Sequence, residues 1–261
     1  MFPIRRDSQG SRGLSAALHS LKETARSLVF PGRCPGCFAF APHPPLCPKC
    51  RNSLVPFESP HCILCGHLFP RGSGEDHLCA ECLERSPIVD KVRAALSYQG
   101  ALRTLIPRLK YHARLSCARE FEYLLFHALE AHFIPEEFDL IIPMPLHIKK
   151  LRSRGFNQSW LLIRHFPELY RTRFNTDPAW KLDLHSLERI RHTPPQTGLD
   201  PKARRRNVKG AFCVTRPENI QDRRILLVDD VYTTGATCAA AAQALLDVGA
   251  LGVDVLVLAR A

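Results

Sequence analysis

The C-terminal two thirds of the chain alternate short apolar runs with segments in which apolar residues recur at helical spacing. The strand-sized apolar runs lie near 92–98, 139–144, 224–228 and 252–258. The spacing between them predicts helices over 121–129, around 160–166 and over 237–248. Strands that are apolar throughout and separated by helices are typical of a parallel sheet covered on both faces. The pattern therefore predicts an α/β fold that binds ligands at the carboxyl ends of its strands.

The first 31 residues show a different pattern. Apolar residues recur there every three or four positions, at Leu14, Leu18, Leu21, Ala25 and Leu28. This spacing predicts an amphipathic helix over 1–31, ended by Pro31-Gly32. No apolar run approaches the roughly 18 residues that a membrane span needs. The N-terminus also lacks the apolar core of a signal peptide, so we expect no transmembrane segment and a cytoplasmic location.

Eight of the eleven cysteines fall into pairs of a single spacing, Cys-x-x-Cys. The four pairs are Cys34/Cys37, Cys47/Cys50, Cys62/Cys65 and Cys79/Cys82. Two intervening residues form a tight turn that points both sulfurs at one metal ion. Gly36 and Gly66 suit such turns, because glycine adopts positive φ without strain. The pairs therefore predict two closed, structural Zn²⁺ sites of four thiolates each.

The spacing does not decide which cysteine pairs share a zinc ion. Neighbouring pairs would form two stacked zinc ribbons, which the short intervening loops favour, and a crossed pairing is the alternative. We expect three parts in the chain: an N-terminal amphipathic helix over 1–31, a double zinc ribbon over 32–86, and the α/β domain over 87–261.

The charge balance favours phosphate-bearing partners. Lysine and arginine number 36 against 25 acidic residues, a formal net charge of +11. Two Zn²⁺ ions, each held by four thiolates, would lower the charge by two apiece, from +11 to +7. Basic residues are dense over 147–173 and 200–224, which suits either the phosphates of a substrate or the backbone of a nucleic acid.

The segment over 225–237 carries the strongest chemical signal in the chain. A buried strand ends in Asp229 and Asp230, and a loop of threonines and glycine then opens a helix. A helix N-terminus suits a phosphate, Gly235 permits close approach of the backbone, and two carboxylates accept hydrogen bonds from the hydroxyls of a ribose. The order of these groups therefore fits a ribose 5-phosphate.

This segment resembles the 5-phosphoribosyl 1-pyrophosphate (PRPP) binding signature of type I phosphoribosyltransferases. The resemblance implies that Asp229 and Asp230 contact ribose hydroxyls and that Mg²⁺ accompanies PRPP. It also implies a loop for the 5′-phosphate, made of Thr233, Thr234, Gly235, Ala236 and Thr237.

Further motifs resemble the ComF family, which is associated with natural competence. They include Ile142-Pro143-Met144-Pro145-Leu146-His147, Arg154-Gly155-Phe156-Asn157-Gln158 and Leu109-Lys110-Tyr111. The paired cysteines ahead of the α/β domain match this family too. The resemblance implies a type I phosphoribosyltransferase fold with an N-terminal double zinc ribbon. It implies a pyrophosphate or phosphate loop drawn from Pro143, Met144, Pro145, Lys110, Arg154 and Asn157.

Three functions are compatible with the sequence. The first is transfer of phosphoribose from PRPP to a nitrogenous base, as in nucleotide salvage. The second, which we favour, is a PRPP-binding protein that handles imported single-stranded DNA, with a protein of the competence machinery as a further partner. The third is a regulator that responds to PRPP without turnover. The sequence identifies neither a catalytic residue nor the acceptor.

Overall fold

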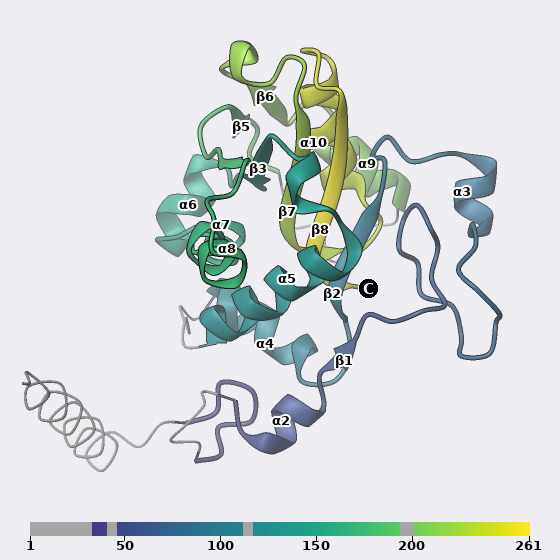
Figure 1. Cartoon of the computed structure of the whole chain (residues 1–261), viewed down its shortest axis with the longest axis vertical. Coiled ribbons are helices and arrows are strands. Elements are labelled where there is room, and N and C mark those ends of the chain that lie inside the picture. The colour runs from purple at the N-terminus through teal and green to yellow at the C-terminus, as the bar shows by residue number, and fades with distance from the viewer. Residues whose placement is uncertain (1–32, 41–45, 112–116, 194–200) are drawn as a thin grey trace, which may run out of the picture.

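The computed structural model describes residues 33–40, 46–111, 117–193 and 201–261. Within these residues the main sheet has six strands in the order β1-β2-β8-β7-β3-β4 (Figure 1). The strands are β1 (Val55–Pro56), β2 (Val92–Ser97), β3 (Leu140–Pro143), β4 (Lys181–Leu182), β7 (Arg224–Tyr232) and β8 (Gly252–Arg260). Strand β1 is antiparallel to β2, and all the other pairings are parallel. The predicted parallel-sheet α/β fold is confirmed.

Apolar side chains on both faces of β7 and β8 explain why this sheet is buried. On β7, Ile225 and Leu227 contribute to one hydrophobic cluster, and Leu226 and Val228 contribute to the other. Successive side chains of a strand point to opposite faces, so a strand that is apolar throughout must be covered on both sides. Every residue of β8 is buried accordingly.

Helices cover both faces of the sheet. The helices are α4 (Leu102–Tyr111), α5 (Ala118–His132), α6 (Ile148–Arg154), α7 (Gln158–Leu161), α8 (Phe166–Phe174), α9 (Pro201–Val208) and α10 (Ala236–Leu246). Helix α5 lies in front of the sheet in Figure 1, and α9 and α10 lie behind it. Short 3₁₀ turns occur at Pro135–Glu137 and Pro217–Asn219.

The helix predicted around 160–166 is wrong in its extent, because the chain forms two helices there. Helix α7 ends at Leu161, and α8 begins at Phe166 with Pro167 in its first turn. Proline lacks the N–H that a helix interior needs but fits the first turn, so a new helix begins at this point. The stretch after α8 contains more strand than the sequence indicated, because β5 (Leu187–Arg189) and β6 (Phe212–Val214) pair as a two-stranded antiparallel sheet.

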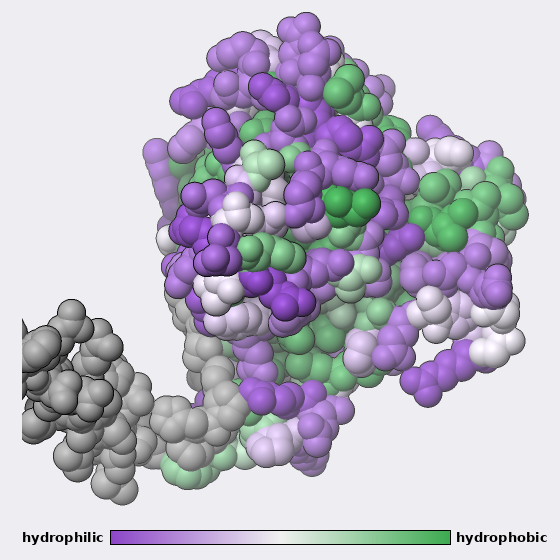
Figure 2. All heavy atoms as spheres, viewed as in Figure 1, coloured by the Kyte–Doolittle hydropathy of each residue, from purple (hydrophilic) through white to green (hydrophobic). Residues whose placement is uncertain are grey.

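The two cysteine-rich modules lie on different sides of the α/β domain. Helix α2 (Pro48–Asn52) belongs to the first and lies below the sheet in Figure 1, whereas α3 (Ala80–Glu84) belongs to the second and lies beside β2. Figure 2 shows hydrophobic residues gathered over the second module, where Leu83 is 69% exposed. The helix predicted over 1–31 lies outside the described residues. None of the helices in the described ranges combines the length and the apolar character needed to cross a membrane.

Candidate functional site

The carboxyl edge of the sheet brings the two predicted phosphate loops together. Strands β3 and β7 are parallel neighbours, with Pro143 opposite Val228 in the register. The pairing continues past the end of β3, because the Met144 N–H donates to the Val228 carbonyl at 2.7 Å. The segment 143–147 therefore lies beside the segment 229–235, although more than 80 residues separate them in the sequence.

Asp229 and Asp230 are both buried at this edge, only 8% and 3% exposed. Asp229 accepts hydrogen bonds from the Ser159 hydroxyl at 3.0 Å and from the Asp230 N–H at 2.8 Å. Asp230 forms an ion pair with Lys110 of α4, whose Nζ lies 2.6 Å from Oδ2. Burial, followed by the charge of Asp230, raises the pKa of Asp229 to about 7. At neutral pH the Asp229 carboxyl therefore retains its negative charge only weakly.

The loop after β7 fits a phosphate. Helix α10 follows it directly, so the positive dipole end of that helix faces the loop. Gly235 caps the helix with φ of 70°, and a Cβ at this position would overlap the Tyr232 hydroxyl. The Oγ1 of Thr234 is buried without a hydrogen-bond partner in the described structure. A buried hydroxyl that lacks a partner is a donor available to a ligand.

A chain of hydrogen bonds connects the loop after β3 to Asp229. The Asn157 side chain donates to the Met144 carbonyl at 3.1 Å and accepts from the Ser159 N–H at 3.0 Å. The Ser159 hydroxyl donates in turn to Asp229. Both ends of the Asn157 amide are thus used within the protein. These hydrogen bonds position the loop after β3 and helix α7, and contact of Asn157 with phosphate stays a prediction.

Four cationic side chains lie close to one another at this edge, and two of them, Lys110 and Arg189, interact with the acids. Lys110 interacts with both Asp230 and Asp229, and Arg154 lies close enough to Lys110 to affect its pKa. Burial lowers the pKa of Lys150, and Arg189, Arg154 and Lys110 lower it further. This mutual repulsion means that positive charge exceeds negative charge at the edge of the sheet. The arrangement favours an anion that carries several charges.

Arg189 and Ser159 are site residues that the sequence analysis missed. Arg189 lies at the end of β5, and its guanidinium lies 5.4 Å from the Phe212 ring centroid and donates to Thr193. Burial lowers the pKa of Arg189, while the charge of Asp229 opposes this effect. Its Nε is buried without a hydrogen-bond partner in the described structure. No local motif marks either residue, since only tertiary contacts bring them to Asp229.

The cysteines form two clusters of neighbouring pairs. The first cluster is Cys34, Cys37, Cys47 and Cys50, and the second is Cys62, Cys65, Cys79 and Cys82, with the sulfurs of each within 4.8 Å of one another. Four thiolates around Zn²⁺ at about 2.3 Å require sulfur separations of about 3.8 Å. The separations of 3.5 Å between Cys37 and Cys47 and 3.7 Å between Cys65 and Cys79 meet that requirement. Both clusters fit structural Zn²⁺.

In each cluster the backbone favours the thiolate form of one cysteine, whereas burial and neighbouring thiols raise the pKa of Cys50, Cys65 and Cys82. Burial raises the pKa of Cys34 and Cys62, but the N–H groups that point at each sulfur outweigh burial and lower it to about 6. Gly66 has the expected positive φ, of 63°. The first turn differs from expectation, because the positive φ lies at Phe38. Gly36 is needed there for another reason, since a Cβ would lie 2.8 Å from the Cys50 sulfur.

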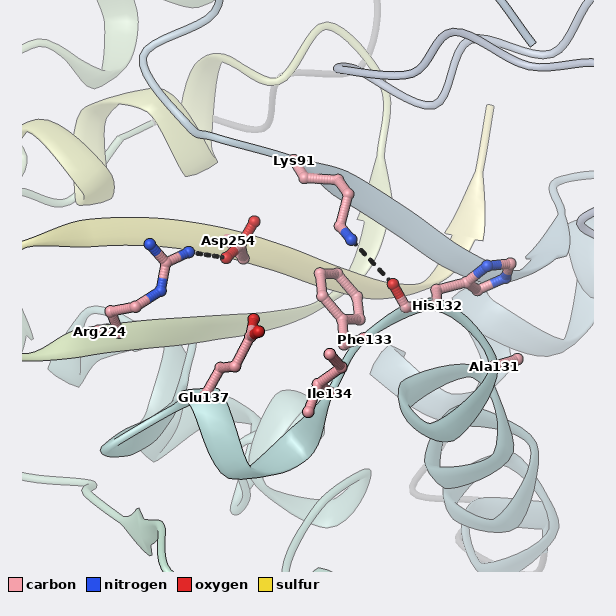
Figure 3. A pocket seen from close by; sticks show the side chains of 8 residues that line it. All are labelled: Lys91, Ala131, His132, Phe133, Ile134, Glu137, Arg224 and Asp254. Carbon is pink, nitrogen blue, oxygen red and sulfur yellow. Dashed lines mark hydrogen bonds and ion pairs between the residues drawn. The ribbon is translucent and has the colours of Figure 1, made fainter.

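A cavity of about 400 Å³ lies at the opposite, amino edge of the sheet (Figure 3). Its charged groups can be compared with those at the carboxyl edge. Its two cations each have a partner: Arg224 donates to Asp254 at 2.9 Å, and Lys91 donates to the His132 carbonyl at 2.9 Å. The excess of positive charge is therefore a feature of the carboxyl edge and not of this cavity.

Known proteins share these features. Residues 25–91 match the family model of the double zinc ribbon domain. Competence protein F of Haemophilus influenzae is 32% identical over 224 residues, which cover 83% of this chain and 90% of that protein. The DNA utilization protein YhgH of Escherichia coli O6:H1 is 33% identical over 232 residues, covering 83% and 97%. Competence protein ComFC of Bacillus subtilis is 25% identical over 218 residues, covering 81% and 82%.

Fold and cysteine clusters together define a class of protein in which a mostly parallel α/β domain follows a double zinc ribbon. This chain is 32% identical to competence protein F over 83% of its own length. It therefore belongs to the ComF family. A solved structure of the allosteric regulatory enzyme of purine biosynthesis aligns with 54% of this chain. The alignment covers 25% of the chain in that structure, with 17% identity and a TM-score of 0.32. So loose a superposition carries no conclusion.

Proposed function

We propose that the protein binds PRPP with Mg²⁺ at the carboxyl edge of its sheet and acts in the cytoplasm in the handling of imported single-stranded DNA. Membership of the ComF family supports the second part, since relatives are named for competence and for DNA utilization. The basic balance of the chain, +11 before zinc, also favours a polyanionic partner. A protein of the competence machinery is the further partner that this role requires.

The observation that carries the PRPP proposal is the set of cations around the buried acid pair. Lys110, Lys150, Arg154 and Arg189 converge on a site with two carboxylates, one of which has a raised pKa. Pyrophosphate would supply the negative charge that this cluster lacks. The 5′-phosphate would occupy the amides of the α10 N-terminus and the unpartnered Thr234 hydroxyl.

Between these two phosphate positions, Asp229 and Asp230 would hold the ribose. Carboxylate oxygens accept hydrogen bonds from vicinal hydroxyls, and they are the ligands that Mg²⁺ prefers. Bound Mg²⁺ would neutralise part of the pyrophosphate charge. The backbone segment Pro143, Met144 and Pro145, held by Asn157, would shape the pyrophosphate side of the site.

This site suits the transfer of phosphoribose to a nitrogenous acceptor. The bond from C1′ to pyrophosphate breaks, a bond from C1′ to the acceptor nitrogen forms, and pyrophosphate leaves with the electron pair. Lys110, Lys150 and Arg189 would stabilise the departing charge. The same site without an acceptor would make the protein a PRPP-responsive regulator. We also retain the division into 1–31, 32–86 and 87–261, whose middle part the match at 25–91 supports.

Calorimetric titration of the zinc-loaded protein with PRPP and Mg²⁺ tests the proposal. We expect binding in the wild type and at least a tenfold loss of affinity in the Asp229→Asn/Asp230→Asn variant. The matched control is Glu136→Gln/Glu137→Gln, an adjacent acid pair that is exposed at the amino edge of the sheet. Absence of binding in the wild type, or equal binding in the wild type and the Asp229/Asp230 variant, would refute the proposal.

Titration with single-stranded DNA at several salt concentrations tests the nucleic-acid part. The logarithm of the binding constant should fall linearly with the logarithm of salt concentration, with a slope of about −0.7 for each phosphate neutralised. Affinity that is absent, or independent of salt, would exclude direct contact with the strand.

A further inference from the structure

The second cysteine module, residues 57–90, is acidic although the chain as a whole is basic. It carries six acidic residues against two arginines, a formal charge of −4, whereas the rest of the chain carries +15. Zn²⁺ with four thiolates would bring the charge of the module to −6. All six acids are exposed: Glu58, Glu75, Asp76, Glu81, Glu84 and Asp90. The module therefore repels phosphate and attracts a cationic partner.

The same module exposes apolar side chains. Leu83 is 69% exposed, Ile63 is 42% exposed and Ile88 is 44% exposed. Leu83 follows Cys82 and Ile63 follows Cys62, and the sulfurs of these two cysteines lie within 4.8 Å of each other. Both apolar side chains therefore lie near one cysteine cluster, and Figure 2 shows hydrophobic residues gathered over this module. An apolar surface bordered by charge marks an interaction site.

Residues 1–31 have the complementary character. They carry five basic residues against two acidic ones, a formal charge of +3. In the helix predicted there, Lys22 directly follows Leu21 of the apolar stripe, and Arg26 directly follows Ala25. Because consecutive residues of a helix are turned by about 100°, both cations would border the stripe on the same side. The segment thus combines an apolar stripe with positive charge, and the module combines an apolar surface with negative charge.

A short connection favours binding between two copies of the chain. Five residues lead from Leu28, the last apolar position of the stripe, to Arg33, where the described chain begins in the first module. Five residues span at most about 18 Å when fully extended. The first module, with α2, and the second module, with α3, lie on different sides of the α/β domain (Figure 1). The connection therefore ties the segment to the first module of its own chain and leaves the second module open to another copy.

We propose that residues 1–31 of one copy bind as an amphipathic helix to the apolar, acidic surface of the second module of another copy. The helix would set its apolar stripe on Leu83 and its two bordering cations near Glu81 and Glu84 of α3. Two copies can exchange their segments reciprocally, so the contact forms twice around a twofold axis. This interaction goes beyond the proposed function, since neither PRPP nor DNA takes part in it.

Sedimentation equilibrium of the zinc-loaded, full-length protein tests the proposal through a charge swap. One variant, Lys22→Glu/Arg26→Glu, reverses the charge of the segment, and the other, Glu81→Lys/Glu84→Lys, reverses the charge of the module. Each variant alone should raise the dissociation constant of the dimer about tenfold, because like charges then meet. An equimolar mixture of the two should recover the association of the wild type, since each segment in the mixed dimer meets a module of opposite charge.

A second pair of variants tests the apolar part of the contact. Leu83→Asp should raise the dissociation constant at least fivefold, whereas Leu251→Asp, which changes a residue 64% exposed outside the module, should leave it unchanged. A zinc content equal to that of the wild type shows that a variant keeps its modules folded. A monomeric wild type, or a dimer that Leu83→Asp leaves intact, would overturn the proposal. Failure of the charge-swapped mixture to associate would equally overturn exchange between copies.

Discussion

Asp229 follows the apolar run 225–228 within β7, and its carboxylate accepts hydrogen bonds from Ser159 and from the Asp230 backbone. Despite these bonds its pKa is raised to about 7, because burial and the neighbouring Asp230 disfavour the charged form. A residue whose ionisation lowers the stability of the fold is retained where it binds a ligand. In the proposed site, that ligand is the ribose of PRPP with its Mg²⁺.

The raised pKa predicts how stability depends on pH. Between the ordinary pKa of 3.8 and about 7, folded Asp229 keeps a proton that the unfolded chain has released. Stability contributed by this residue therefore falls as pH rises through that window. We expect Asp229→Asn to raise the free energy of unfolding at pH 8 by about 1–2 kcal/mol, and to bring less benefit at pH 4.

Urea unfolding of the wild type and variant at both pH values measures this effect. Asp247→Asn, an exposed residue at the end of α10, is the control and should leave the difference between pH 4 and pH 8 unchanged. A variant that is less stable than the wild type at pH 8 would show that the Asp229 carboxylate stabilises the fold.

At the scale of single residues, the sequence predicted those that lie in contiguous motifs. Asp229, Asp230 and the threonine loop stand next to one another in the chain, so a local pattern could mark them. Arg189 reaches Asp229 only through the pairing of β5 with β6, and Ser159 reaches it only through the packing of α7. Their roles depend on tertiary structure, which one sequence does not display. The roles of the predicted residues in binding stay predictions.

At the scale of elements, the loop between β7 and α10 depends on Gly235. A side chain there would need the left-handed φ of 70° and would also overlap the Tyr232 hydroxyl. We expect Gly235→Ala to weaken PRPP binding at least tenfold and to lower the free energy of unfolding by about 2 kcal/mol, because strain and overlap act together.

Gly210 offers a control that separates the two effects. Its φ is 62°, and a Cβ there would meet nothing within 4 Å. Gly210→Ala should therefore cost only the strain, about 1 kcal/mol, and should leave PRPP binding unchanged. Equal effects of the two substitutions on PRPP affinity would show that the shape of the loop after β7 does not matter for binding.

The elements with strong hydrophobic patterns were the ones predicted correctly. Strands β7 and β8 lie in the centre of the sheet and carry long apolar runs, at 225–228 and 255–259, as burial on both faces requires. The break between α7 and α8 was missed although Pro167 signals it, because the apolar spacing continues across the break. Local sequence thus identified the central elements better than it identified their ends.

At the scale of the whole molecule, both cysteine modules support the carboxyl edge of the sheet. Arg108 of α4 donates to the Pro35 and Gly36 carbonyls of the first module, and two residues later Lys110 pairs with Asp230. Arg260 connects the second module to Thr233. Zinc would therefore influence PRPP binding without contacting the ligand, by fixing the turns that hold α4 and the loop after β7.

Loss of one zinc ion should weaken PRPP binding. Cys37 is an exposed member of the first cluster, and Cys213 is an exposed cysteine outside both clusters. Atomic emission should measure two zinc ions per chain in the wild type and in Cys213→Ser. It should measure one zinc ion per chain in Cys37→Ser. The PRPP affinity of Cys37→Ser should fall at least fivefold, because the turn that anchors Arg108 is no longer held. Zinc loss with unchanged PRPP affinity would contradict this coupling.

A crystal structure of the zinc-loaded protein with Mg²⁺ and PRPP tests the central claim most directly. We predict the 5′-phosphate on the backbone amides of 233–237, the ribose hydroxyls on Asp229 and Asp230, and the pyrophosphate beside Met144 within reach of Lys150 and Arg189. Zinc ions should occupy both cysteine clusters. PRPP bound at the amino-edge cavity beside Lys91 and Arg224, or no PRPP at saturating concentration, would contradict the account.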